Sequence, residues 1–243
     1  MEFKEIFQKE KPVIGMIHLS GNSTEIRLER ALGELAIYQE NGVDGAIIED
    51  YHGNEDDVYN ALRESDKKGF KIIRGVNYLG DPYSSFELAK EFGARFVQFD
   101  SVQTRDLHLN LYDKLRKEYL DIAVLGGVRF KYTRKTGNSL EQDLMEAKTR
   151  CEAIVTTGTG TGIETPLKKL IEFRKILGDF PLIAGAGVNK DNVYEQLKTA
   201  DSAIIGSYFK PNGITILEVN ACLVRNLIDE VEMLRRDLKS SNH

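Results

Sequence analysis

The chain has 243 residues, of which 41% are hydrophobic and 29% are charged. This composition excludes a disordered chain, a collagen-like chain and a disulfide-stapled miniprotein, and the length suits one α/β barrel or two small domains. The formal net charge of −5 argues against a nucleic-acid partner, because nucleic-acid binding requires a basic surface.

The cysteines and the N-terminal residues indicate in which cellular compartment the protein is expected. Cys151 and Cys222 have neither CxxC nor Cys/His spacing, and we interpret both as buried reduced thiols outside the chemistry. The first residues, MEFKEIFQKEK, are charged, and no apolar run approaches the roughly 18 residues that a membrane span needs. The sequence therefore predicts a cytoplasmic protein with no integral membrane segment.

Short apolar runs alternate with stretches of helical periodicity, and this unit occurs eight times along the chain. Near-continuous apolar runs are typical of strands covered on both faces. Eight strand–helix units favour an α/β fold of the closed (β/α)8 TIM-barrel type over an open doubly wound sheet. The predicted strands are residues 13–19, 46–49, 72–77, 96–99, 123–130, 153–156, 181–184 and 202–205.

The boundaries between these units agree with one domain. The last helix is predicted over about 216–238, so residues 239–243 are expected to form a loose tail. Residues 1–11 form an N-terminal extension, and no linker divides the rest, which predicts a single TIM-barrel domain over 1–243. Four glycines each end a helical stretch, as helix C-cap glycines do: Gly42, Gly69, Gly93 and Gly178.

Glycine-rich turns follow the seventh and eighth predicted strands. Ligands of such barrels bind at the carboxyl ends of the strands, where glycine lets the backbone approach an anion closely. We therefore predict that Gly185, Gly187, Gly206 and Ser207 bind a phosphate group. The alternative is that these residues only form tight turns in a crowded barrel rim.

Two other strand ends offer ligand contacts. Threonine and glycine alternate from Thr156 to Gly162, and we predict that Thr157 and Gly158 contact substrate hydroxyls or phosphate. A flexible lid or turn is an equal alternative for this loop. Asn77 ends the third strand and is a further predicted ligand contact, whereas Arg74 is interpreted as a structural cation deeper in the barrel.

Carboxylates at the strand ends suit acid/base catalysis. Isomerisation or enolisation of a sugar phosphate needs a general base and a nearby acid, and Glu49 and Asp100 end the second and fourth strands. Burial at the end of an apolar strand would raise the pKa of Glu49 toward neutrality. His18 ends the first strand as an acid/base candidate. The alternatives are structural salt bridges for the carboxylates and a hydrogen-bonded structural role for the histidine.

Lys131 is the predicted catalytic cation. It shares a side of the fifth strand with Arg129 if that strand is regular, and an inward Lys131 would stabilise negative charge on a substrate. Outward exposure or ion pairing with a carboxylate is the alternative. We predict no metal site and no cofactor, because nothing in the spacing of His18, Glu49 and Asp100 requires an ion.

Six segments, from about Pro12 to Arg225, resemble the BtpA family: VIGMIHL, VDGAIIED, GVN, VTTGTGTG, AGAGVNKDNV and AIIGSYFKPNG. The family is named for a photosystem I biogenesis factor and includes SgcQ-like proteins of sugar-related gene clusters. The resemblance implies a ribulose-phosphate-binding-type barrel, labelled by analogy with phosphoribosylanthranilate isomerase. The family tends to carry Asp where Gly127 stands and His where Tyr132 stands. Matching positions are His18, Glu49, Asn77, Lys131, Gly158, Gly162, Gly185, Gly187, Asn192, Gly206 and Lys210.

These features predict an enzyme that acts on a phosphorylated sugar or nucleotide-like metabolite by isomerase or lyase chemistry. Glu49 is the expected base, Asp100 or His18 its partner, and Lys131 the electrostatic stabiliser. The family name suggests an alternative, a non-catalytic assembly or stability factor for a membrane complex, and a metal-dependent hydrolase is a weaker one. The expected ligand is a phosphorylated small molecule, and a homo-oligomer through outer helices is the default expectation.

Overall fold

The computed structural model describes residues 1–241, in which eight parallel strands close into a barrel in the order β1 to β8. Parallel pairing of β8 with β1 completes the ring, so the predicted TIM barrel is confirmed. The strands are β1 (Val13–Ile17), β2 (Gly45–Glu49), β3 (Ile73–Asn77), β4 (Phe96–Phe99), β5 (Ala123–Gly127), β6 (Ala153–Thr156), β7 (Leu182–Ala184) and β8 (Ser202–Ile205).

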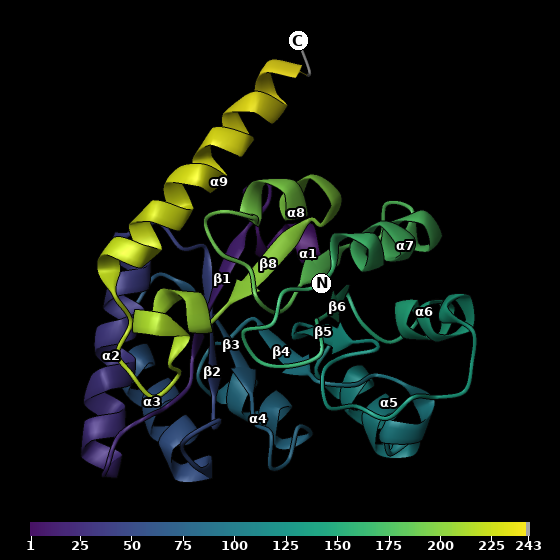
Figure 1. The fold of residues 1–243 in the computed structure, drawn as a ribbon. Helices are drawn as coiled ribbons and strands as arrows, with labels where there is room; N and C mark the ends of the chain where they lie inside the picture. The colour runs from purple at the N-terminus through teal and green to yellow at the C-terminus, as the bar shows by residue number, and fades with distance from the viewer. Residues whose placement is uncertain (242–243) are drawn as a thin grey trace.

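Helices lie around the outside of the barrel (Figure 1). All four predicted C-cap glycines have positive φ angles, between 60° and 80°, which L side chains rarely adopt. The helices are α1 (Phe3–Ile6), α2 (Thr24–Glu40), α3 (Glu55–Lys67), α4 (Ser84–Glu91), α5 (Leu109–Glu118), α6 (Leu140–Lys148), α7 (Leu167–Leu177), α8 (Val193–Thr199) and α9 (Ala221–Ser241), with short 3-10 turns η1 (Thr104–Asp106), η2 (Ser207–Phe209) and η3 (Pro211–Gly213).

The last helix differs from its predicted bounds. It begins at Ala221, and Ile216 is exposed in the preceding loop. It continues to Ser241, so residues 239–241 of the expected loose tail are helical, while 242 and 243 lie outside the described residues. The helix packs on α8 and α2 and then projects beyond the barrel (Figure 1).

The prediction of two buried thiols is half right. Cys151 is buried, but Cys222 is exposed. The buried stripe of α9 includes Val224, Leu227 and Val231, and Cys222 lies on the opposite side of the helix at 100° per residue.

The N-terminal extension closes one end of the barrel. Phe3, Ile6 and Phe7 are buried in the same apolar cluster as the barrel interior, and the ring of Phe7 lies 5.7 Å from that of Phe96 at the start of β4. The amino ends of the strands are therefore covered. Ligand access is left to the carboxyl ends.

Strand alternation explains which side chains reach that open end. Apolar inward residues fill the barrel, among them Met16 on β1, Ile47 on β2 and Ile204 on β8. Side chains alternate between the faces of a strand, so the next inward position after each lies two residues on. These positions are His18, Glu49 and Gly206.

The end of β5 departs from the sequence interpretation. The strand stops at Gly127, where a Cβ atom would lie 2.0 Å from the carbonyl oxygen of Asp100, so only glycine fits. Arg129 has a left-handed backbone, with φ of 48°, and its Nε pairs with Asp143 of α6 at 3.0 Å. The regular strand on which a shared direction for Arg129 and Lys131 was predicted therefore does not extend to these residues, although both side chains line one cleft.

Arg74 also lies elsewhere than expected. Its guanidinium donates hydrogen bonds to Ser65 Oγ and Asp66 Oδ1 of α3, both at 3.0 Å. It is a structural cation, but it ties the barrel to an outer helix instead of lying in the interior.

Within residues 1–241, no helix has the length and apolar character needed to cross a bilayer.

Candidate active site

Glu49 lies at the carboxyl end of β2 and is almost fully buried. Its Oε1 accepts a 2.8 Å hydrogen bond from Asn77 Nδ2 of the neighbouring strand. Burial, and after it the nearby charge of Asp100, raises the pKa of Glu49 to about 8, against the opposing effects of Lys131 and Asn77. The carboxyl group therefore exchanges its proton near neutral pH, as the sequence analysis expected.

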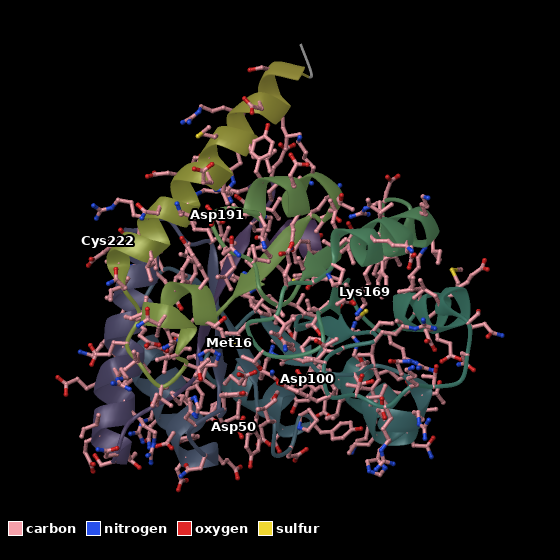
Figure 2. All side chains as sticks on the ribbon, viewed as in Figure 1. Met16, Asp50, Asp100, Lys169, Asp191 and Cys222 are labelled. Carbon is pink, nitrogen blue, oxygen red and sulfur yellow. The ribbon has the colours of Figure 1, made fainter. Side chains whose placement is uncertain are left out.

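Asp100 directly follows β4 at the carboxyl end of that strand and is labelled in Figure 2. Its Oδ1 accepts hydrogen bonds from Gln98 Nε2 at 3.0 Å and from Asn77 Nδ2 at 3.3 Å. Burial raises the pKa of Asp100 despite these bonds. One amide nitrogen thus links the two predicted catalytic carboxyl groups. The neighbouring Asp50 instead accepts a bond from the backbone N–H of Leu79 at 2.7 Å.

Gln98 is a site residue that the sequence analysis missed. It is 2% exposed, lines the cavity at the barrel mouth and donates to Asp100, while its Oε1 has no hydrogen-bond partner. The available signal was its position on β4, inward and between Phe96 and Asp100. A polar side chain there faces the barrel interior by strand alternation.

His18 lies beside Glu49 but does not bond to it. The distance from His18 Nε2 to Glu49 Oε2 is 4.0 Å, beyond hydrogen-bond range. Burial, and then the charge of Lys210, lowers the pKa of His18 well below its usual value, so the imidazole is neutral at pH 7. Its Nδ1 is buried without a partner, as is Gln98 Oε1. Buried polar atoms of this kind normally bond to a ligand or to water.

Lys131 supplies the positive charge of the site. Its backbone N–H donates to Thr157 Oγ1 at 2.6 Å, and its ammonium lies 5.6 Å from the ring centroid of Phe130. Its charge lowers the pKa of both Glu49 and Asp100. No carboxylate of residues 1–241 lies within 4.0 Å of the ammonium, so the predicted alternative of a direct ion pair is absent there.

The glycine turns line one cavity of about 30 Å³ together with His18, Glu49 and Lys131, whereas Asp100 lies outside its lining. The N–H groups of Gly187, Val188 and Ser207 have no hydrogen-bond acceptor among residues 1–241. They are free to donate to an anion. The lining includes His18, Glu49, Gln98, Lys131, Gly185, Gly187, Val188, Gly206 and Ser207.

Three predicted ligand contacts lie beside this cavity instead of lining it. Asn77 is 1% exposed, and its amide nitrogen donates to the carboxyl groups of Glu49 and Asp100. Thr157 is fully buried, where its hydroxyl group accepts from Lys131 and donates to the carbonyl of Gly158. A Cβ on Gly158 would lie 2.4 Å from the carbonyl oxygen of Glu164, so this glycine lets the loop fold back on itself.

The loop of residues 157–165 covers the cavity. Its backbone lies directly on Gly187, where an added Cβ would be 2.2 Å from the nitrogen of Glu164. Two tyrosine hydroxyls contact Thr161: that of Tyr51 lies 3.4 Å from Thr161 Oγ1, and that of Tyr132 accepts from the Thr161 N–H at 3.1 Å. The cavity therefore has room for about one water molecule while the loop is closed.

Metal-binding geometry is a separate question. Across residues 1–241, no group of three or more His, Cys, Asp or Glu side chains is arranged to hold a metal ion. His18 lies 4.0 Å from Glu49, and the carboxyl groups of Glu49 and Asp100 bond to Asn77 and Gln98.

Comparison with known proteins assigns the family. The BtpA family model matches residues 9–233. The chain belongs to the BtpA family. An uncharacterised protein of Archaeoglobus fulgidus is 29% identical to it, over 90% of this chain and 98% of that one. The photosystem I biogenesis protein BtpA of Synechocystis is 26% identical, over 88% and 85%, and the sgc region protein SgcQ of Escherichia coli is 24% identical, over 96% and 98%.

Solved structures agree on the fold of this BtpA-family chain. The native KDPGal structure superposes with a TM-score of 0.68 at 14% identity and covers 97% of this chain and 100% of its own. The N-(5'-phosphoribosyl)anthranilate isomerase of Pyrococcus furiosus superposes with a TM-score of 0.60 at 15% identity, over 92% and 99%. At such identities the likeness establishes the barrel alone.

Proposed function

We propose that this chain is an enzyme that acts on a phosphorylated sugar or nucleotide-like metabolite by proton transfer, as an isomerase or lyase. One observation carries the proposal. Glu49, whose pKa is raised to about 8, lines the same cavity as the unpaired N–H groups of Gly187, Val188 and Ser207. An anion-binding backbone beside a carboxyl group tuned to neutral pH suits proton abstraction from a sugar phosphate.

Each site residue has a role in this proposal. The glycine turns hold the phosphate through N–H groups, which need no arginine. Glu49 removes a proton from carbon and returns it, since a pKa near the working pH allows both steps. Lys131 and the neutral imidazole of His18 stabilise the negative oxygen that develops. Asn77 and Gln98 act as positioning residues for Glu49 and Asp100.

Binding requires the loop of residues 157–165 to move. A phosphate group is larger than the cavity of about 30 Å³, and the loop backbone lies against Gly187. Much of this loop is exposed, and few hydrogen bonds connect Thr161 to the rest of the barrel. Loops held in this way open at low free-energy cost and close over bound substrate.

A thermal-shift screen tests the binding half of the proposal. The ligands are inorganic phosphate, ribose 5-phosphate, ketose phosphates and nucleotides, with unphosphorylated ribose as the control. Ligand binding to the native state raises the melting temperature, so the phosphorylated compounds should raise it and ribose should not. The variant Gly206→Ala should lose the shift, because its Cβ would lie 2.8 Å from Cε1 of His18. No shift with any phosphorylated compound contradicts the proposal.

Turnover of a compound found in this screen tests the catalytic half. Glu49→Gln keeps the shape and the acceptor for Asn77 but removes the base, so turnover should fall by about 10²- to 10⁴-fold. Lys131→Ala should also reduce turnover. Exchange of Glu40, an exposed carboxylate at the end of α2, for Gln controls for the loss of one negative charge. Unchanged turnover in Glu49→Gln and Lys131→Ala excludes the assigned roles.

The name of the Synechocystis relative supports a second candidate, a non-catalytic assembly factor. Under this alternative, affinity purification of the tagged chain should give a stoichiometric protein partner, and no small molecule should stabilise the chain. The screen described above separates the two candidates, because only the enzyme proposal predicts a shift with phosphorylated compounds.

A further inference from the structure

A second and larger cleft opens beside the candidate active site. Its volume is about 580 Å³, and the loops that follow β5 and β6 form its walls. Phe130 and Lys131 line both this cleft and the active-site cavity, so the two spaces meet at these residues. The cleft is therefore the adjoining space into which a substrate longer than one phosphate and one reacting carbon would extend.

The lining of this cleft is strongly basic. Five cations contribute to it, and no Asp or Glu of residues 1–241 lines it: the cations are Arg129, Lys131, Arg134, Lys135 and Lys169. Of these, Arg129 forms an ion pair, with Asp143. Arg134 and Lys135 form no ion pair with any carboxylate of the described residues. The concentration of unpaired positive charge contrasts with the net charge of −5 for the whole chain.

Lys169 of α7, labelled in Figure 2, is a half-buried source of this charge. Its ammonium donates to the carbonyl oxygens of Arg129 at 2.8 Å and Thr157 at 2.7 Å, one from each wall of the cleft. Burial, and then the charge of Arg129, lowers the pKa of Lys169 to about 8. A bound anion would favour the charged form of this amine.

We propose that this cleft binds a second anionic group of the substrate, a phosphate or a carboxylate, while the first phosphate occupies the glycine turns. The substrate class is then a small molecule with an anion at each end and its reacting carbon between them, beside Glu49 and Lys131. This inference rests on the proposed function. Beyond that function, it states that the substrate needs two anionic groups to bind with full affinity.

The second anionic group would orient the substrate in the active-site cavity. The cavity beneath the 157–165 loop is lined by the carboxyl group of Glu49, and an anion placed there alone gains only the free N–H groups and Lys131. Charged groups lining a cleft with one sign of charge attract an oppositely charged ligand and orient it. The basic cleft would hold the distal end of the substrate and so fix the register of the reacting carbon against Glu49.

Affinity measurements by isothermal titration with three probes test this inference at fixed ionic strength. Ribose 5-phosphate carries one anionic group, ribulose 1,5-bisphosphate carries two phosphates, and 6-phosphogluconate carries a phosphate and a carboxylate. The wild type should bind at least one two-anion probe about tenfold more tightly than ribose 5-phosphate, since one charge-assisted hydrogen bond contributes about that much. Preference between the two probes identifies the second anion as phosphate or carboxylate.

Two double variants carry the same loss of charge in different places. Arg134→Gln with Lys135→Gln removes two cations from the cleft, and Lys114→Gln with Lys117→Gln removes two exposed cations from α5. The ratio of two-anion to one-anion affinity should fall about tenfold in the first variant and stay unchanged in the second. A ratio that survives in the first variant, or falls equally in both, overturns the assignment of the cleft.

The outcomes also separate the inference from the proposed function. Binding of ribose 5-phosphate with no gain for either two-anion probe leaves the proposed function standing and overturns the second site. Failure of all three probes overturns both.

Discussion

Asn77 donates a 2.8 Å hydrogen bond from Nδ2 to Oε1 of Glu49, its direct register partner on the neighbouring strand. The pairing is set by the parallel ladder of β2 and β3, so the barrel itself fixes the orientation of the carboxyl group. This bond favours the ionised carboxylate but does not offset burial, and the pKa of Glu49 remains about 8. Ionisation of the buried Glu49 therefore destabilises the folded protein, and this cost is measurable without any substrate.

The first prediction concerns stability against pH. The unfolded chain loses the Glu49 proton near pH 4.3, whereas the folded protein keeps it to about pH 8. Between these values the folded state binds more protons, so this residue lowers the free energy of unfolding as pH rises. Glu49→Gln lacks this loss and should gain stability relative to the wild type, on the order of 3 kcal/mol between pH 5 and pH 8 as an upper value.

Urea unfolding of both proteins from pH 5 to pH 8 checks this prediction. Glu40→Gln is again the control for one lost negative charge. A difference between Glu49→Gln and the wild type that stays constant over this range would show that Glu49 titrates as an ordinary carboxylate.

Strand alternation made much of this site predictable. Apolar runs located β1, β2 and β8, and counting in steps of two from their inward residues gives His18, Glu49 and Gly206. The glycine turns were predictable from residue type: Gly187 has a positive φ of 65°, and an added Cβ at Gly206 would lie 2.8 Å from His18. These predictions depend only on local pattern and on the closure of eight strands.

Contacts between segments that lie far apart in the chain could not be predicted from the sequence pattern. A regular fifth strand through Lys131 was the assumption, but β5 ends at Gly127, where the chain passes close to the Asp100 carbonyl, and Arg129 has a left-handed backbone. Asn77 was expected to contact ligand, yet it holds two carboxyl groups from neighbouring strands. The closed loop over Gly187 likewise depends on residues 51, 132 and 161 meeting in space.

The second prediction separates backbone strain from contact with the loop. Gly178 and Gly187 both have left-handed backbones, with φ of 60° and 65°. An added Cβ meets nothing within 4 Å at Gly178 but lies 2.2 Å from Glu164 N at Gly187. Gly178→Ala should therefore cost about 1–2 kcal/mol from strain alone. Gly187→Ala should cost about 1–3 kcal/mol more, because the loop must shift.

The free energies of unfolding in urea give both costs. Equal costs for the two variants would mean that the 157–165 loop moves away from Gly187 without penalty, and would contradict the closed arrangement described here.

The third prediction concerns opening of this loop. Tyr132→Phe removes the acceptor of the Thr161 N–H while leaving an aromatic ring that is largely exposed in any case. The net value of one such hydrogen bond makes the open state up to about tenfold more populated. Amide hydrogen exchange at Thr161 should accelerate by the same factor. Tyr194→Phe, which removes a hydroxyl bonded to Asp237 on the far helices, should leave Thr161 exchange unchanged.

The fourth prediction assigns Lys210 a structural role, although it matches a recurrent family position. Its ammonium lies 2.6 Å from Glu34 Oε1, both side chains are at most 3% exposed, and it also donates to the carbonyl of Leu217. The same Glu34 oxygen accepts from the Val219 N–H at 3.2 Å, so this pair fastens the segment before α9 to α2. Lys210→Met leaves a buried carboxylate unpaired and should cost about 3–5 kcal/mol.

A double variant decides whether this cost comes from the ion pair or from packing. Adding Glu34→Leu to Lys210→Met removes the unpaired charge, so it should recover most of the lost free energy of unfolding, as for other buried pairs replaced by apolar side chains. Lys198→Met, which breaks an exposed pair with Glu195, should change stability little. If the double variant is as unstable as Lys210→Met alone, the bonds of Lys210 to Leu217 and of Glu34 to Val219 hold this segment, and the ion pair itself contributes little.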